Sequence, residues 1–146
     1  MEQDDFMDLS SSDLGQLPET KKQLAIKTKH LLVNDNNITV LPRYVGVFSN
    51  LVSLDISNNQ LQHISEEIVH LSHLQSFEAR NNCLDNESIP KEFSDLLSLI
   101  NINLSGNRLT EIPSQFFSLS YLECLSLGGN RIKSVPKDIR NLSRLV

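Results

Sequence analysis

One recurring pattern of apolar residues constrains the fold of this chain more than any other feature. Residues 99–113 follow the pattern LxxLxLxxNxLxxIP, in which the asparagine is Asn107 and the proline is Pro113. Units of this kind begin at Thr28, Leu51, Leu74, Leu99 and Leu122, at intervals of 23, 23, 25 and 23 residues. A unit of this size cannot bury its own apolar face, so the units must stack on one another.

The pattern resembles the leucine-rich repeat family, and the agreement of five units makes the resemblance specific. It implies an α/β fold, a leucine-rich repeat solenoid with a curved parallel β-sheet on the concave side and helical or extended segments on the convex side. Residues 28–144 are expected to form the five repeats, and residues 145–146 to begin a truncated sixth. A last repeat without a polar cap would leave apolar side chains uncovered, so the chain is expected to be a fragment or a truncated product.

Residues 1–27 are less regular than the rest of the chain. Their apolar residues keep the spacing of a degenerate leading repeat, with Ser12 where the asparagine would stand. We expect this segment to cap the first full repeat, as the ends of solenoids require, and a docking peptide is the alternative. Good helix formers follow Pro18 up to Lys27, which predicts a short helix there.

Composition narrows the class of partner and the compartment. The chain has 146 residues, 39% of them hydrophobic, and a net charge of −5 with scattered basic residues, which disfavours nucleic acid and anionic membranes as partners. The N-terminus is acidic, unlike a signal peptide, and no apolar run reaches the length of a membrane span. Only two cysteines, Cys83 and Cys124, are present, so the sequence predicts a cytoplasmic protein.

Asparagine and proline recur at fixed places in the units, and both are expected to be structural. The asparagine falls where the chain turns inward, so its amide can satisfy buried backbone groups of adjacent turns. The expected asparagine ladder is Asn36, Asn59, Asn82, Asn107 and Asn130. The proline fixes the backbone of the return segment in four units, at Pro42, Pro90, Pro113 and Pro136, and Ser65 replaces it in the second unit.

Residues that flank the middle apolar residue of each strand are expected to point away from the core, onto the concave surface. A row of polar side chains on a curved sheet suits the binding of a protein or peptide, and a merely solvated face is the alternative. The residues expected to bind a partner are Asp55, Ser57, Glu78, Arg80, Asn101, Asn103 and Ser105.

The third unit departs from the pattern in two places. Phe77 and Ala79 replace two core aliphatic residues, which indicates an exchange of a large for a small side chain that conserves volume. The run from Asp85 to Ser88 adds two residues and should bulge near the lower edge of the sheet. Insertions of this kind can become binding loops, and a tolerated extension is the alternative.

The sequence contains no recognisable catalytic, cofactor or metal constellation, so we expect neither an enzyme nor a small-molecule substrate. His70 and His73 form a pair, but no nearby cysteine or carboxylate completes a ligand set. Cys124 has no histidine beside it in the expected row, which disfavours a nucleophilic role.

Within the leucine-rich repeat family the resemblance is closest to a member with a similarly long third repeat. It rests on residues 79–84, on Leu104–Asn107 and on residues 125–136. This resemblance implies an intracellular, non-enzymatic protein that acts by binding other proteins, with further repeats and a non-repeat tail beyond this region. The alternative function is that of a substrate receptor of a ubiquitin ligase, with its docking element in the missing C-terminal part.

Overall fold

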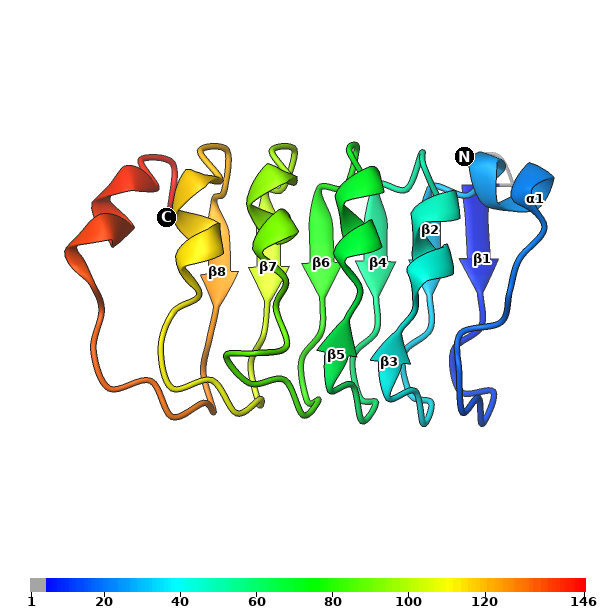
Figure 1. Cartoon of the computed structure of the whole chain (residues 1–146), viewed down its shortest axis with the longest axis horizontal. Coiled ribbons are helices and arrows are strands. Elements are labelled where there is room, and N and C mark those ends of the chain that lie inside the picture. Colours follow the sequence, from blue (N-terminus) through cyan, green and yellow to red (C-terminus); the bar gives the residue numbers. More distant parts are fainter. Residues whose placement is uncertain (1–4) are drawn as a thin grey trace.

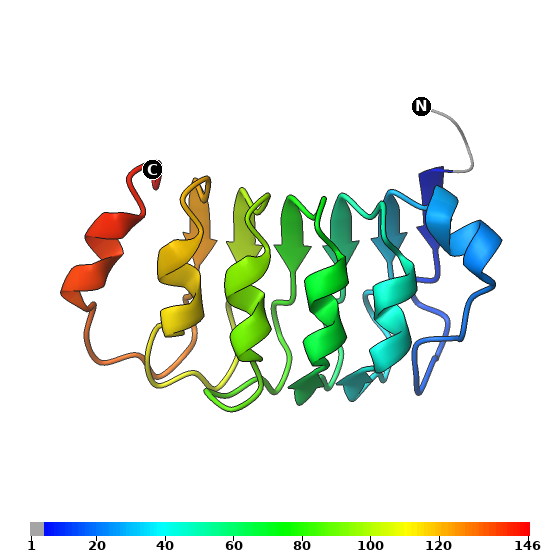
Figure 2. The same ribbon diagram turned by 45° about the horizontal axis from the view of Figure 1, so that its top comes forward.

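The computed structural model describes residues 5–146, which wind into a solenoid of two layers (Figure 1; Figure 2). One layer is a six-stranded parallel sheet with the order β1-β2-β4-β6-β7-β8. Its strands are β1 (Phe6–Asp8), β2 (His30–Leu32), β4 (Ser53–Asp55), β6 (Ser76–Glu78), β7 (Asn101–Asn103) and β8 (Cys124–Ser126). Apart from the second sheet described below, strands follow one another in chain order, as expected when each turn adds one strand to the same edge. This architecture confirms the predicted leucine-rich repeat solenoid.

The opposite layer consists of short 3₁₀ helices, one in each of the five repeats. They are η2 (Arg43–Val47), η3 (Glu66–His70), η4 (Lys91–Asp95), η5 (Ser114–Ser118) and η6 (Lys137–Asn141). The proline that recurs in the repeats explains where they begin, because four of the five start directly after a proline and η3 starts after Ser65. Proline suits the start of a helix because it has no N–H to leave unpaired.

Ser65 has a structural consequence of its own. Its side chain accepts a hydrogen bond from the Glu67 N–H at 3.3 Å, which caps η3. Its backbone N–H donates to the Leu41 carbonyl at 3.0 Å, a bond that proline could not make. Next to this bond lies a second, two-stranded sheet formed by β3 (Val40–Leu41) and β5 (His63–Ile64), and it joins the first two repeats only.

Buried and half-buried side chains alternate along the inner strands, and the buried ones form the core between the two layers. In β2, β4, β6 and β7 the middle residue is buried and both flanking residues are half-buried. The core of the middle repeats is aromatic: the rings of Phe77 and Phe93 lie 5.3 Å apart at 73°, and those of Phe93 and Phe116 lie 5.4 Å apart at 54°. Phe77 and Ala79 are both fully buried, which fits a large residue beside a small one.

The repeated asparagines bond to buried backbone on both sides. Asn82, for example, donates through Nδ2 to the Ile56 carbonyl of the preceding turn at 3.0 Å and to the Ala79 carbonyl of its own turn at 3.1 Å. Its Oδ1 accepts from the Leu61 N–H at 2.9 Å. Asn36, Asn59, Asn107 and Asn130 bond in the same way. The side chains therefore satisfy backbone groups that the inward turn removes from water.

The N-terminal segment packs onto the first repeat. Strand β1 pairs with β2 in parallel, with Met7 opposite Leu31. Helix α1 (Lys22–Lys27) confirms the short helix expected there, and Ala25 is its buried residue. The Tyr44 hydroxyl donates to the Leu17 carbonyl, which connects this segment to η2.

The apolar side chains of the last repeat are more exposed than their counterparts in the earlier repeats. Val135 occupies the repeat position that Ile64 and Ile112 hold in earlier repeats, where both are buried, but its side chain is 66% exposed, because within the described residues no further turn packs against it. Leu125, Leu127 and Ile132 are only partly buried for the same reason, whereas Leu142 is 4% exposed.

The asparagine bonds give a stability prediction. Replacing Asn82 with alanine leaves one buried N–H and two buried carbonyls without this partner, so we expect Asn82→Ala to lower the free energy of unfolding by about 3 kcal/mol. Asn130→Ala is the matched control, because Asn130 makes equivalent bonds but is only partly buried, and water can replace its amide. We expect a loss of about 1 kcal/mol for the control. Urea unfolding followed by circular dichroism measures both, and equal losses would contradict the role of burial.

Candidate functional site

The two residues that flank the buried middle residue of each strand point away from the core and form one surface, which we call the sheet face. The strand register places them in two rows that run across the sheet. The first row is Phe6, His30, Ser53, Ser76, Asn101 and Cys124, and the second row is Asp8, Leu32, Asp55, Glu78, Asn103 and Ser126.

An acidic pair lies in the middle of the second row. Asp55 of β4 stands in register with Glu78 of β6, and both side chains are half-buried. Asn101 Nδ2 donates to Glu78 Oε1 at 2.7 Å and to Ser76 Oγ at 3.2 Å, so the Glu78 carboxylate is held in one orientation. The second oxygen of each carboxylate accepts no hydrogen bond from any described residue, so both can accept one from a partner.

A local turn fixes Asp55 and its counterparts at the ends of other strands. Asp55 Oδ1 accepts from the Ser57 N–H at 2.9 Å, and Asn103 Oδ1 accepts from the Ser105 N–H at 3.0 Å. An aspartate or asparagine that bonds the backbone two residues later restricts its own rotamer. The face is therefore preorganised at Asp55 and Asn103.

Three predicted residues lie beyond the strand ends, and the structure places them differently. Arg80 is exposed and forms no ion pair with Asp55 or Glu78 among the residues that the structure covers. Ser105 is half-buried. Ser57 corrects the expectation that it faces a partner, because it is 1% exposed, and its hydroxyl has no hydrogen-bond partner within the described chain. It lies where the chain turns inward to Asn59, with neighbouring turns on both sides, and these cover it.

The first strand adds an aromatic end to the sheet face that the sequence analysis missed. The rings of Phe6 and His30 stack at 4.6 Å and 25°, and His30 Nδ1 lies 2.6 Å from Ser53 Oγ. Phe6 is 45% exposed. Phe6 and Asp8 flank Met7 as His30 and Leu32 flank Leu31, so the repeat pattern contained the signal that would have found them.

A row of residues with left-handed backbone conformation borders the sheet face next to the buried asparagines. The sequence pattern hints at it, since each residue before a ladder asparagine is Asp, Asn or Gly, the types that tolerate this conformation. These residues are Asp35, Asn58, Asn81, Gly106 and Gly129, with φ between 55° and 71°.

The first three side chains of this row form an exposed chain of hydrogen bonds. Asn58 Nδ2 donates to Asp35 Oδ1 at 3.0 Å, and Asn81 Nδ2 donates to Asn58 Oδ1 at 2.9 Å. The chain stops at Gly106, where a Cβ atom would lie 2.3 Å from Asn81 Oδ1.

The insertion in the third repeat folds back onto its neighbours. Ser88 Oγ donates to the Gln62 carbonyl at 2.6 Å, and Asp85 Oδ1 accepts from the Glu87 N–H at 2.9 Å. Asn86 Nδ2 donates to the Thr110 hydroxyl, and Asn86 Oδ1 accepts from the Thr110 N–H. Most polar groups of this loop are thus already bonded within the chain, which favours a tolerated extension over a binding loop.

The histidines and cysteines do not converge. His70 lies on the helical layer, where its Nε2 is 2.9 Å from Glu67 Oε2, while His73 lies on the turn beyond η3. Cys83 and Cys124 are unpaired. Over residues 5–146 no group of three or more potential metal ligands is found. None of the helices described in these residues is long and apolar enough to span a membrane.

Asp8, in the second row of the sheet face, has a shifted carboxyl pKa. Its Oδ1 accepts from the Ser10 hydroxyl at 2.6 Å and from the Ser10 N–H at 3.0 Å. These two bonds hold the pKa of Asp8 below its ordinary value of 3.8, because they favour the charged form.

Comparison with known proteins agrees with this geometry. A family model described as leucine-rich repeat matches residues 26–84 and 97–146. Leucine-rich repeat-containing protein 58 of Xenopus tropicalis is 45% identical over 103 residues, which cover 70% of this chain and 28% of that protein. Residues 79–84 and the fourth and fifth repeats carry the predicted resemblance to one particular member of the family. That member is leucine-rich repeat-containing protein 58, and the match confirms the prediction.

Two further matches cover small parts of larger proteins. The mouse leucine-rich repeat serine/threonine-protein kinase 1 is 34% identical over 112 residues, 72% of this chain and 6% of that protein. Among solved structures, the plant peptide hormone receptor RGFR1 in complex with RGF2 matches with a TM-score of 0.76 and 31% identity, over 90% of this chain and 21% of that one. The chain thus spans 28% of the length of the Xenopus protein and still smaller shares of these two larger proteins.

The bonds to Asp8 predict a titration. Ser10→Ala removes the hydroxyl donor, so we expect the pKa of Asp8 to rise toward 3.8, as measured by NMR of the carboxyl carbon. Because the folded pKa lies below the unfolded one, these bonds contribute stability above the unfolded pKa, and the contribution is lost as the pH falls through the folded pKa. Ser12→Ala is the control and should leave the pKa of Asp8 unchanged, since Ser12 donates to the Ser10 carbonyl instead.

Gly106 gives a second prediction. Gly106→Ala places an L residue at a positive φ of 71° and displaces the exposed side chain of Asn81, so we expect it to lower the free energy of unfolding by about 1 kcal/mol, mainly through the backbone conformation. Gly128→Ala is the matched control, because a Cβ atom there meets nothing within 4 Å, and it should be nearly neutral. Urea unfolding compares the two, and a similar loss at both positions would contradict this explanation.

Proposed function

Because the chain belongs to the leucine-rich repeat family, a family of protein-interaction modules, we propose that the sheet face, on the concave side of the solenoid, binds a protein partner. The observation that carries the proposal is the acidic pair of Asp55 and Glu78, which stand in register on adjacent strands without an ion pair among the described residues. Carboxylates held in place by Ser57 N–H and Asn101 are ready to accept hydrogen bonds at little cost in side-chain entropy.

The neighbouring residues define what such a partner offers. The free oxygens of Asp55 and Glu78 suit a basic side chain, and arginine suits them best because its planar group bonds to carboxylates through two donors. Arg80, at the end of the same strand as Glu78, suits an acidic group. Asn101 and Asn103 add amide groups on the next strand, so the partner surface is polar and of mixed charge. The solved receptor with a similar fold is bound to a peptide hormone, which supports a peptide or protein as the ligand class.

On this proposal the protein is non-enzymatic and acts in the cytoplasm. The unpaired Cys83 and Cys124 fit a reducing compartment. One relative is named as a kinase, but this chain matches only 6% of that protein's length. The kinase name therefore says nothing about an activity of these repeats. The role of substrate receptor for a ubiquitin ligase stays a prediction that none of these observations tests.

A neutralising double substitution tests the sheet face. Asp55→Asn with Glu78→Gln removes two charges but keeps the acceptor oxygens, just as Asn103 accepts from Ser105 at the equivalent place. We expect the variant to capture the partner at least about tenfold less well from cell extract, as measured by quantitative mass spectrometry. Its free energy of unfolding should change by less than about 0.5 kcal/mol.

The matched control removes two charges from the opposite layer. Glu92→Gln with Asp95→Asn changes the net charge equally but lies on η4. This control should capture the same proteins as the unaltered chain. If the sheet-face variant captures them equally well, the binding surface lies elsewhere.

A further inference from the structure

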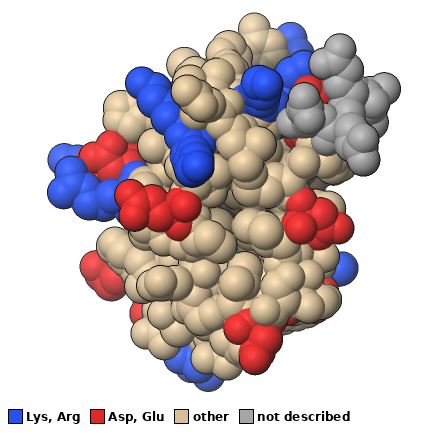
Figure 3. All heavy atoms as spheres, turned by 90° about the vertical axis from the view of Figure 1, so that its right-hand side faces the viewer, with Lys and Arg blue, Asp and Glu red and all other residues tan. Residues whose placement is uncertain are grey.

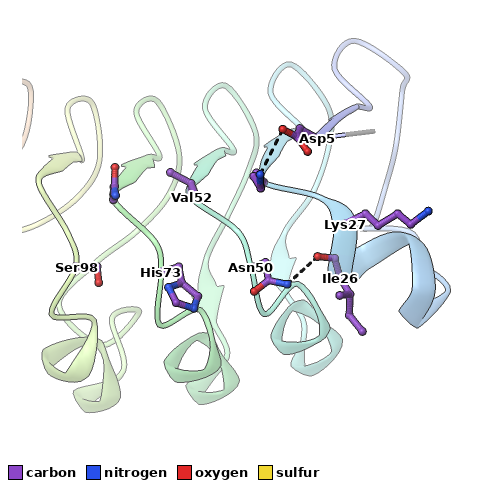
Figure 4. Close-up of a pocket in the computed structure, with 9 residues that line it drawn as sticks. Asp5, Ile26, Lys27, Asn50, Val52, His73 and Ser98 are labelled. Carbon is purple, nitrogen blue, oxygen red and sulfur yellow. Dashed lines mark hydrogen bonds and ion pairs between the residues drawn. The ribbon is translucent and has the colours of Figure 1, made fainter. Parts of the chain in front are cut away.

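A groove runs along the edge of the sheet where the strands begin, which is the upper edge in Figure 1, and it is separate from the sheet face. Two adjoining hollows of about 570 and 240 Å³ form it, and they share Gln75 and Ser98. One wall consists of the residues just before the strands: Lys29, Val52, Gln75 and Ile100. Figure 4 shows Asn50, His73 and Ser98 on successive turns, and these form the other wall.

The first wall is a continuous backbone ladder, so the groove is built into the fold. The N–H of Val52 donates to the Lys29 carbonyl at 2.7 Å, that of Gln75 to Val52 at 2.8 Å, and that of Ile100 to Gln75 at 2.8 Å. Side chains of this wall therefore stand one strand spacing apart, about 4.8 Å.

The two ends of the groove differ in chemistry. Lys27 and Lys29 lie at the N-terminal end. Asp5 pairs with Lys29 at 3.5 Å, whereas the exposed Lys27 side chain extends past the end of the groove (Figure 4) and has no ion pair among the described residues. In the end view of Figure 3 most Lys and Arg side chains lie in the upper half, the side on which the strands begin. This end suits an acidic group.

The other end of the groove is apolar. Leu97 is 55% exposed and Tyr121 is 51% exposed, and both line the second hollow beside Ile100. The guanidinium carbon of Arg144 lies 4.4 Å from the centre of the Tyr121 ring, a cation–π contact that stabilises this position of the ring. Exposed large apolar side chains that lie together in this way are typical of interaction surfaces.

Between the ends the lining is polar. The side chains of His73 and Gln75 are exposed and make no hydrogen bond to any other described residue, so they can bond to the backbone of a bound segment. A segment lying along the groove crosses three strand spacings from Lys29 to Ile100, about 14 Å, which extended chain covers in about four residues.

We propose that this edge groove binds an extended segment of a partner protein that carries an acidic residue and, four to six positions away, a large aliphatic or aromatic residue. The acidic residue contacts Lys27 and Lys29, and the apolar residue packs against Leu97 and Tyr121. The site is separate from the sheet face, so the partner of the repeat module contacts it in two places or two partners bind at once.

A random dodecapeptide library displayed on phage is the probe. Selection on the purified chain should enrich peptides with an acidic and a large apolar residue four to six positions apart. The best of these, made as a fluorescent synthetic peptide, should bind Lys27→Glu and Leu97→Ser at least tenfold more weakly in fluorescence anisotropy. All these side chains are exposed, so the substitutions leave the fold intact.

Controls carry the same chemical changes to other exposed positions. Lys133→Glu and Val135→Ser should bind the peptide as the unaltered chain does, and so should the sheet-face variant Asp55→Asn with Glu78→Gln. A peptide whose acidic residue is replaced by lysine should regain affinity for Lys27→Glu.

The proposal is overturned if the selected peptides share no such pattern, if the groove variants bind them unchanged, or if the sheet-face variant abolishes binding. It is also overturned if the chain selects no peptide but sediments with phosphatidylserine vesicles, since the groove would then face a membrane. If the sheet-face variant no longer captures the protein partner but still binds the selected peptide, the result supports the sheet face and the edge groove as two independent binding surfaces.

Discussion

Turning a chain inward after every strand removes backbone N–H and carbonyl groups from water, and the whole structure depends on how these groups are satisfied. Asparagine does so because one amide carries two donors and an acceptor that reach both its own turn and the preceding one. Asn82 illustrates the result, since it is buried and bonds to Ile56, Ala79 and Leu61. The bonds set the distance between turns, and the strand register and the stacking of phenylalanine rings follow from that distance.

A scaffold fixed in this way leaves the outward positions of each strand free to vary. On the sheet face they change from Phe6 and His30 at one end, through the carboxylates of Asp55 and Glu78, to the amides of Asn101 and Asn103. Polar side chains also organise one another there, since Asn101 orients Glu78 across the strand pair. The chemistry of the surface therefore depends on residues that the repeat pattern does not specify, supported by backbone that it does.

The periodic part of this structure could be predicted from the sequence, because spacing alone determines which residues lie in register. The solenoid, its parallel sheet and the position of the return segments follow from that period. Ser57 could not be placed correctly, since its burial depends on the side chains of adjacent turns and not on its position in its own repeat. The exposure of Val135 has the same origin. The edge groove was not predicted, because its walls come from residues that lie between the repeated positions.

The return segments follow the ladder asparagines, and the number of backbone hydrogen bonds between neighbouring return segments falls from the first pair of repeats to the last. Between the first two repeats the N–H groups of Gln60, Gln62 and Ser65 all bond across the gap, whereas between the last two described repeats this edge has the Arg131 bond to Leu109. A parallel sheet closed along one edge resists bending, while one joined more sparsely there can open or tighten its curvature with little loss of bonding. The return segments are therefore bonded to each other more densely between the first two repeats than between the last two, so a change of curvature at the C-terminal end would break fewer backbone hydrogen bonds.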